Sequence, residues 1–182
     1  KRIEGPWLMG IPDMYHDVRL LAYNGRDRNT RLWSKLETDE AYREIVKTIW
    51  QDGFEPFENQ SDEFVHGFTM NRDAQTERAV AAAEKLRAKD VEVIFVNHPY
   101  EGIFETYATT YVPREETWDI LLERTGALGL HWQGHEEMQG YWLPEWSHMT
   151  GTGADSYTKA LYHLIQRERL RHARGVMAPA SL

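Results

Sequence analysis

The chain of 182 residues has no cysteine, and this absence excludes disulfides, thiolate metal sites and a cysteine nucleophile. It also lacks any run of about eighteen apolar residues, so we expect no membrane span, and no signal peptide is recognisable. Because the first residue is Lys1 rather than Met, we expect the N-terminus to have been processed, trimmed or left out. The compartment therefore stays open between the cytoplasm and the cell envelope.

Basic residues are also in short supply. The chain has 21 Lys and Arg residues against 29 Asp and Glu residues, which gives a net charge of -8. Because binding to phosphates needs a basic face, this balance excludes a general nucleic-acid binder. The one Arg-rich stretch, residues 167–175, has two interpretations. It is either a contact for an acidic partner or lipid headgroups, or the solvated end of a helix.

Apolar residues are sufficient for a folded core. Hydrophobic residues make up 41% of the chain and aromatic residues 12%, which excludes a disordered chain. The length is that of one domain of ordinary size. We therefore expect residues 1–182 to form a single α/β domain or the C-terminal part of one. Glycine and proline interrupt residues 1–30, so we expect this N-terminal segment to be irregular.

Helical periodicity is present in several stretches. The first begins at Ser34, where Ser34 and Glu37 match a capping box, and ends at Gly53. The following residues, 53–72, are acidic and aromatic without a clear period, and we expect a loop there. Further helices are predicted at residues 73–89, 113–126 and 154–172.

Two apolar runs indicate strands. The segment VEVIFVNHP, residues 91–99, is rich in β-branched residues, as in a strand that is buried on both faces. The segment ALGLHWQ, residues 127–133, is the second. Alternating helices and strands are typical of an α/β layered domain with a parallel sheet. Two or three strands are few for such a sheet. We therefore expect it to be incomplete in this chain, with an upstream segment or a protein partner completing it.

The segment LPEWSH, residues 143–148, offers candidate catalytic residues. A carboxylate three residues before a histidine on a turn is positioned to accept the Nδ1 proton of the imidazole. Nε2 is then free to act as a general base. We therefore predict that His148 is the base and Glu145 its orienting carboxylate. Asn97, His98 and Trp146 are predicted to contribute to substrate binding, because loops after strands meet at one edge of a parallel sheet. The alternative is a well-packed turn in which His148 only caps the last helix.

The same segment resembles a known family. EWSH before the final helix, preceded by the VEVIFVNHP strand and the WDILLERTGALGLHW unit, is similar to the C-terminal half of the SGNH (GDSL-type) hydrolase superfamily. The likeness covers roughly residues 73–170 and is greatest to bacterial cell-envelope-type members. It implies a three-layer flavodoxin-like fold, ester or acyl chemistry without a cofactor, and Glu145 in the place usually held by Asp.

The chain also departs from that family, and the departure leaves two hypotheses. The family nucleophile is a serine in a Gly-Asp-Ser motif after the first strand, and no serine of this chain follows Gly-Asp. The first hypothesis is an esterase or acyltransferase that acts on a small-molecule ester or an acylated glycan, with the nucleophile segment upstream. The second is a non-catalytic binding or assembly subunit of a larger complex.

Residues 131–137 contain candidate metal ligands. His131, His135, Glu136 and Glu137 are residue types that bind metal ions. A spacing of four residues on a strand-to-loop segment does not bring the two imidazoles together. We therefore expect a polar loop here and no metal site.

Overall fold

The computed structural model describes residues 21–26, 28–54 and 56–175. Of these residues, 63% are helical and 9% lie in strands, and the strands form two separate sheets of two strands each. The prediction of a three-layer flavodoxin-like (SGNH-type) parallel sheet is therefore wrong. The physical reason for the difference is that few segments of the chain form strands. No described strand is longer than four residues.

The helices dominate the chain order. The α-helices are α1 (Lys35–Thr38), α2 (Glu40–Gly53), α3 (Asp62–Arg87), α4 (Gly102–Tyr111), α5 (Trp118–Thr125) and α6 (Gly151–Ala173). The strands are β1 (Ala22–Asn24), β2 (Thr30–Leu32), β3 (Ile94–Asn97) and β4 (Leu128–His131). Short 3₁₀ turns are η1 (Phe57–Asn59), η2 (Arg114–Glu116), η3 (Trp132–Gly134) and η4 (Glu136–Met138).

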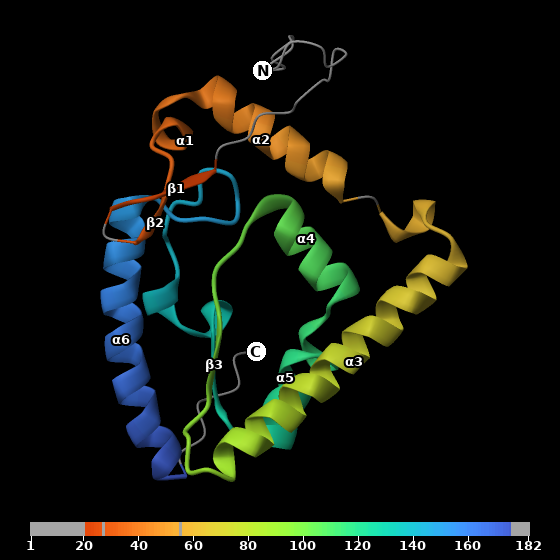
Figure 1. Ribbon diagram of the computed structural model, residues 1–182, viewed down its shortest axis with the longest axis vertical. Coiled ribbons are helices and arrows are strands. Elements are labelled where there is room, and N and C mark those ends of the chain that lie inside the picture. The colour runs from red at the N-terminus through yellow and green to blue at the C-terminus, as the bar shows by residue number, and fades with distance from the viewer. Residues whose placement is uncertain (1–20, 27, 55, 176–182) are drawn as a thin grey trace.

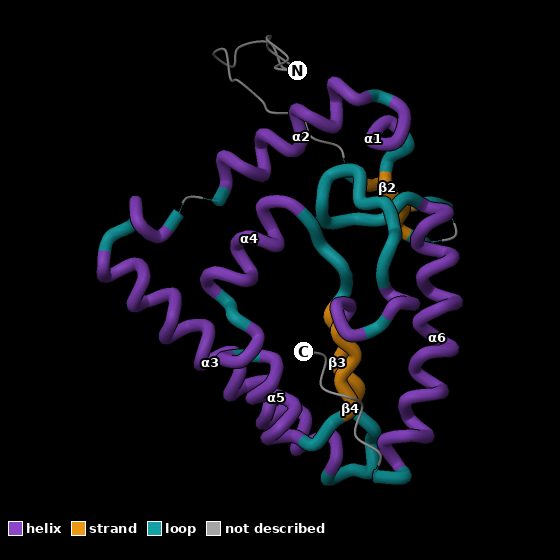
Figure 2. Tube along the Cα trace, turned by 180° about the vertical axis from the view of Figure 1, so that it is seen from behind, coloured by secondary structure: helices purple, strands orange, loops and turns teal. Residues whose placement is uncertain are grey.

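The two longest helices lie on opposite sides of the β3–β4 pair. In Figure 1, α6 runs along one side of these strands, while α3 lies on the other side with α5 beside it. The view from behind in Figure 2 shows the same arrangement, with β1 and β2 near the start of α6. The helix α4 follows β3 in the chain, and both views place it between β3 and α3.

The central pair β3–β4 is parallel, as the sequence predicted. Its register places Ile94 beside Leu128 and Val96 beside Leu130. Alternate side chains of a strand point to the same face, so these four residues share one face. They pack against α6 in a cluster that includes Leu130, Met138, Tyr157 and Leu164. On the other face, Gly129 leaves room for Leu122 of α5, because a Cβ at this glycine would collide with the leucine.

The helix predicted from Ser34 is two helices. Ser34 makes no side-chain capping bond, whereas Asp39 caps α2 by accepting a hydrogen bond from the Tyr42 backbone N–H at 3.0 Å. Gly53 ends α2 as predicted. A second hydrophobic cluster packs these helices on β2, through Leu32, Leu36, Tyr42 and Val46.

The loop predicted at residues 53–72 is also wrong, since α3 begins at Asp62. Ser61 caps the helix by accepting from the Phe64 backbone N–H at 3.2 Å. Phe64 and Phe68, one turn apart, both pack against the ring of Phe57. Tertiary packing of these rings, rather than periodicity, extends the helix.

The N-terminal segment predicted to be irregular, residues 1–30, lies only partly within the described residues. Residues 1–20 of the segment predicted to be irregular lie outside them. Residues 22–24 and 30–32 pair as the antiparallel strands β1 and β2. Among the described helices, none combines the length and apolar character that a bilayer crossing requires.

Candidate functional site

The loop between η4 and α6 is built around a buried carboxylate. Glu145 is 0% exposed, and Leu143 and Pro144 before it are buried as well. Its Oε2 accepts from Nε1 of Trp50 at 2.7 Å, and its Oε1 accepts from the backbone N–H of His148 at 2.7 Å. The Ser147 hydroxyl adds a bond of 2.9 Å to Oε2. Several donors therefore satisfy the charge that burial would otherwise penalise.

The imidazole of His148 is held by the same carboxylate. Its Nδ1 lies 2.7 Å from Oε1 of Glu145, and the His148 side chain is 54% exposed. A carboxylate only accepts, so Nδ1 carries the proton and Nε2 has a free lone pair. Within the described residues, no group bonds to Nε2 of His148. The hydrogen bond to Glu145 raises the pKa of His148 above its ordinary value of 6.5, against the opposing effect of burial.

Trp146 gives the loop its shape. Its φ is 74°, in the left-handed region that bulky residues rarely adopt, and its carbonyl accepts from the backbone N–H of Glu101 at 2.9 Å. The indole packs against Gly102, where an added Cβ would lie 2.5 Å from a ring carbon. Lys47 lies 5.2 Å from the centre of the ring. The turn at Trp146 thus sends Glu145 inward and leaves His148 at the surface.

Among the described serines, Ser147 bonds to the imidazole, but it lies on the wrong side to act as a nucleophile. Its Oγ is 2.8 Å from Nδ1 of His148, the nitrogen that Glu145 already occupies. A nucleophile has to bond to the free nitrogen, Nε2, to lose its proton to the base. Ser147 therefore acts as a hydrogen-bond donor to Glu145 rather than as a nucleophile.

A cavity of about 810 Å³ reaches this loop. Ser147 lines it, together with residues of α3, α4, α5 and the carboxyl ends of β3 and β4. Both Asn97 and His98, the predicted substrate-binding residues of the β3 end, are among its lining residues. Trp146 is not part of the lining that the described residues form. The Oδ1 of Asn97 is buried, and no described group donates to it.

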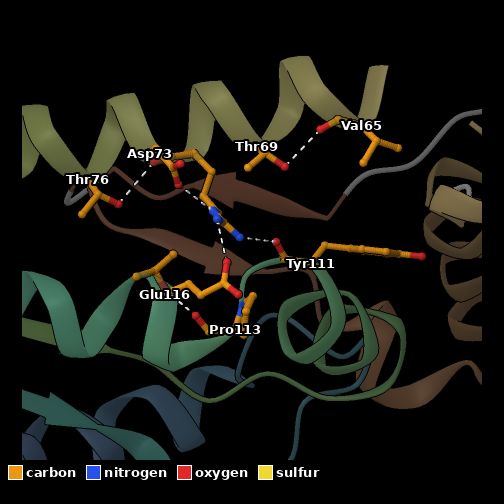
Figure 3. Close-up of polar contacts among 9 residues, drawn as sticks. Val65, Thr69, Asp73, Thr76, Tyr111, Pro113 and Glu116 are labelled. Atoms are coloured by element: carbon orange, nitrogen blue, oxygen red, sulfur yellow. Dashed lines mark hydrogen bonds and ion pairs between the residues drawn. The ribbon is translucent and has the colours of Figure 1, made fainter. Parts of the chain in front are cut away.

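The cationic groups on the cavity wall are already paired. Arg72 donates to Asp73 at 3.0 Å and to Glu116 at 2.7 Å, and it also reaches the Tyr111 carbonyl at 3.5 Å. Figure 3 shows these three partners around the guanidinium, which links α3 to the segment after α4. Arg114, the other arginine of the lining, donates to Asp119 at 2.9 Å.

The histidines on the cavity wall are neutral at pH 7. Burial lowers the pKa of His131 to about 4, with smaller effects from nearby charges. Burial also lowers the pKa of His98, whose Nδ1 lies 2.7 Å from the Tyr157 hydroxyl. Because burial raises the pKa of Tyr157 to about 12, that hydroxyl stays protonated. These imidazoles therefore offer hydrogen bonds and no charge.

The candidate metal ligands of residues 131–137 do not converge. Among the described residues, no three His, Asp or Glu side chains gather in a geometry that would hold a metal ion. His131 instead accepts from the Gln133 backbone N–H at 3.3 Å and lines the cavity. Glu137 pairs with Arg167.

The Arg-rich stretch at residues 167–175 is largely neutralised. Arg167 and Arg171 bond to the buried Glu168 at 2.8 and 2.9 Å. Arg169 bonds to Glu92 after α3. These pairs join the end of α6 to its neighbours, which favours the interpretation as a helix end over a basic contact surface.

Comparison of the chain with protein-family models, curated proteins and solved structures found no match in any of the three. Membership of the SGNH superfamily therefore stays a prediction that rests on the sequence motif alone.

Sequence reasoning missed the groups that complete the site. Trp50 bonds to Glu145 across 95 residues of sequence, and no local pattern pairs them. The aromatic residues of α4 that line the cavity, Phe104 and Tyr107, lie in a helix outside the predicted ones. A signal was present in the i, i+3 spacing of these two rings, which places them on one helix face.

Proposed function

We propose that Glu145 and His148 form a general-base dyad that promotes hydrolysis or transfer of an ester-linked acyl group. The observation that carries the proposal is the 2.7 Å bond between Nδ1 and a fully buried carboxylate, in a His148 side chain that is 54% exposed. The resemblance of EWSH to the last block of SGNH hydrolases, whose nucleophile is a serine, supports ester chemistry with His148 as the base. The substrate class is a small-molecule ester, such as an acylated glycan.

The chemistry needs only a water or a substrate hydroxyl at Nε2. In this scheme, His148 takes a proton from that oxygen while the oxygen attacks the acyl carbonyl carbon. The C–O bond to the leaving alcohol then breaks, and the imidazolium returns its proton to the departing oxygen. Glu145 keeps Nδ1 protonated and stabilises the imidazolium, as a buried carboxylate does in a catalytic triad.

The test is hydrolysis of p-nitrophenyl acetate by the purified chain. We expect His148→Ala to lower kcat/KM by about 100-fold or more, the usual contribution of a general base. The matched control is His163→Ala, because His163 is an exposed histidine on α6 outside the site. In the wild-type chain, kcat/KM should rise with pH through the raised pKa of His148.

Equal rates for the wild-type chain and His148→Ala, with both variants folded, would refute a base at this position. Loss of activity in His163→Ala to the same extent would assign the effect to a general loss of structure. Labelling of the wild-type chain by a fluorophosphonate would reveal a serine nucleophile in place of direct attack by water.

The alternative function is a non-catalytic binding or assembly subunit. It is favoured by one observation, that no described serine or threonine bonds to Nε2 of His148. Under this alternative, Glu145 has only a structural role, in which it holds α2 to the loop through Trp50. A folded chain without any hydrolysis above the His148→Ala background would support it.

A further inference from the structure

The cavity next to the Glu145–His148 loop has an aromatic wall. Phe54, at the end of α2, lies edge-to-face on two rings of α4, with centroids 5.1 Å from Phe104 and 4.8 Å from Tyr107. The lining also includes Trp118 and Leu121 of α5. All five side chains are only half-buried, so apolar surface faces the open cavity. Covering this surface with an apolar group is favourable, because it removes apolar area from water.

The cavity offers no free charge to a ligand. Neither Asp nor Glu is among the described lining residues, which disfavours a cation. The guanidinium groups of Arg72 and Arg114 are occupied by carboxylates of the protein, and an anion would have to compete with these. His131 is neutral at pH 7, because burial lowers its pKa to about 4. An uncharged ligand therefore suits the cavity.

The cavity also reaches a residue between the two members of the dyad, although neither Glu145 nor His148 is among its described lining residues. Ser147 lines it and bonds to both Glu145 and His148, at 2.9 and 2.8 Å. Ser147 lies on the Nδ1 side of the imidazole, so a group that fills the cavity has to extend past Ser147 to meet the free Nε2. The volume of about 810 Å³ lies in the range of cavities that bind small organic molecules.

We propose that this cavity binds the acyl group of the substrate, and that the group is an uncharged aliphatic chain or ring much larger than acetyl. The proposal rests on the proposed function for the identity of the ligand as an acyl group. The apolar chain lies between α3, α4 and α5, and the ester carbonyl extends from the cavity past Ser147 to the Nε2 side of His148. The alcohol part of the ester leaves toward solvent.

The test uses binding without turnover. The uncharged fluorescent probe N-phenyl-1-naphthylamine is bound to the full chain and displaced by octanamide, acetamide, octanoate or methyl glucoside. We expect octanamide to displace the probe at a concentration at least about tenfold below that of acetamide, and below that of octanoate. Displacement by methyl glucoside but not by octanamide would overturn the proposal in favour of a sugar site.

Substitutions that fill the cavity test whether octanamide binds there. Ala79→Phe on α3 and Ala108→Phe on α4 both place a ring among the lining residues. The matched control is Ala81→Phe, since Ala81 is exposed on α3 and outside the lining. We expect the two filling variants to bind octanamide at least about tenfold more weakly, and the control to bind as the wild-type chain does. Equal weakening in all three variants would place the ligand elsewhere.

Two readouts separate this proposal from the proposed function. Thermal melting identifies any variant that fails to fold. If Ala79→Phe fails to fold, Ala108→Phe alone tests the binding site. His148→Ala should bind octanamide normally while it loses hydrolysis. If the wild-type chain bound octanamide as expected but hydrolysed no ester, the proposal that His148 is a general base would be refuted. The proposal of an apolar binding site would stand. Hydrolysis that depends on His148 but shows no preference for octanoyl over acetyl esters would refute the acyl cavity and leave the base.

Discussion

His131 lines the cavity and His148 follows the lining residue Ser147, and their surroundings shift the pKa values of the two histidines in opposite directions. His148 is half-exposed and bonds to the buried carboxylate of Glu145, which raises its pKa. His131 is buried without a carboxylate on its ring, and its pKa falls to about 4. The comparison shows that a buried carboxylate, rather than the degree of exposure alone, decides which histidine is suited to carry a proton at neutral pH.

The largest effect should come from removing the carboxylate. Glu145→Gln keeps the side-chain volume but directs an amide N–H toward groups that donate to Glu145, among them Nε1 of Trp50. We expect the free energy of unfolding to fall by about 2–4 kcal/mol, because a buried donor loses its charged acceptor. Chemical denaturation measures this loss.

The matched control for this substitution is Glu136→Gln, on an exposed residue of η4. It should change the free energy of unfolding by less than about 0.5 kcal/mol. Similar losses in both variants would show that Glu145 is not a centre of the loop's hydrogen bonds.

A smaller effect is expected from disturbing the turn at Trp146. Gly102 has a φ of 57°, and a Cβ there would lie 2.5 Å from the indole. Gly102→Ala should destabilise the protein by about 1–3 kcal/mol, through strain in the left-handed region and displacement of the ring. Thermal unfolding and indole fluorescence would report both changes.

Gly67→Ala is the control for the glycine substitution. Gly67 lies within α3, and a Cβ added to it would have no neighbouring atom within 4 Å. Alanine there should stabilise the helix by about 0.5–1 kcal/mol. If Gly102→Ala were equally stabilising, the close packing of Trp146 on Gly102 would be disproved.

The smallest effect is expected from the protonation of His131 at acidic pH. Its folded pKa lies below the unfolded value of 6.5, so the unfolded chain binds more protons between about pH 6.5 and 4. Its contribution to stability is therefore complete above pH 6.5 and falls as the pH drops. From pH 7 to 5, His131→Gln should lose about 1–2 kcal/mol less than the wild-type chain does. Urea unfolding at the two pH values measures this, and equal losses would contradict a neutral His131.

Part of this fold could be predicted from the sequence. The β-branched run at 91–99 and the apolar run at 127–133 indicated the parallel pair β3–β4, because few other segments favour a strand. The Glu145–His148 spacing indicated a contact, since three residues on a turn fix a short distance. The catalytic roles of these two residues stay predictions.

Other features depend on contacts between distant segments. The amino-terminal turns of α3 rest on Phe57 packing against Phe64 and Phe68, which periodicity does not reveal. Trp50 reaches Glu145 only after α2 docks on the loop. The expectation of a large parallel sheet failed because alternation of helices and strands does not fix the number of strands that pair.

The most direct test of the dyad is an NMR titration of the His148 ring in the wild-type chain and in Glu145→Gln. A raised pKa means that the bond to Glu145 stabilises the fold below about pH 6.5, and that this contribution is lost as the pH rises through the folded pKa. We predict a His148 pKa above 6.5 that falls in Glu145→Gln. A His148 pKa at or below 6.5 that the substitution leaves unchanged would contradict the dyad.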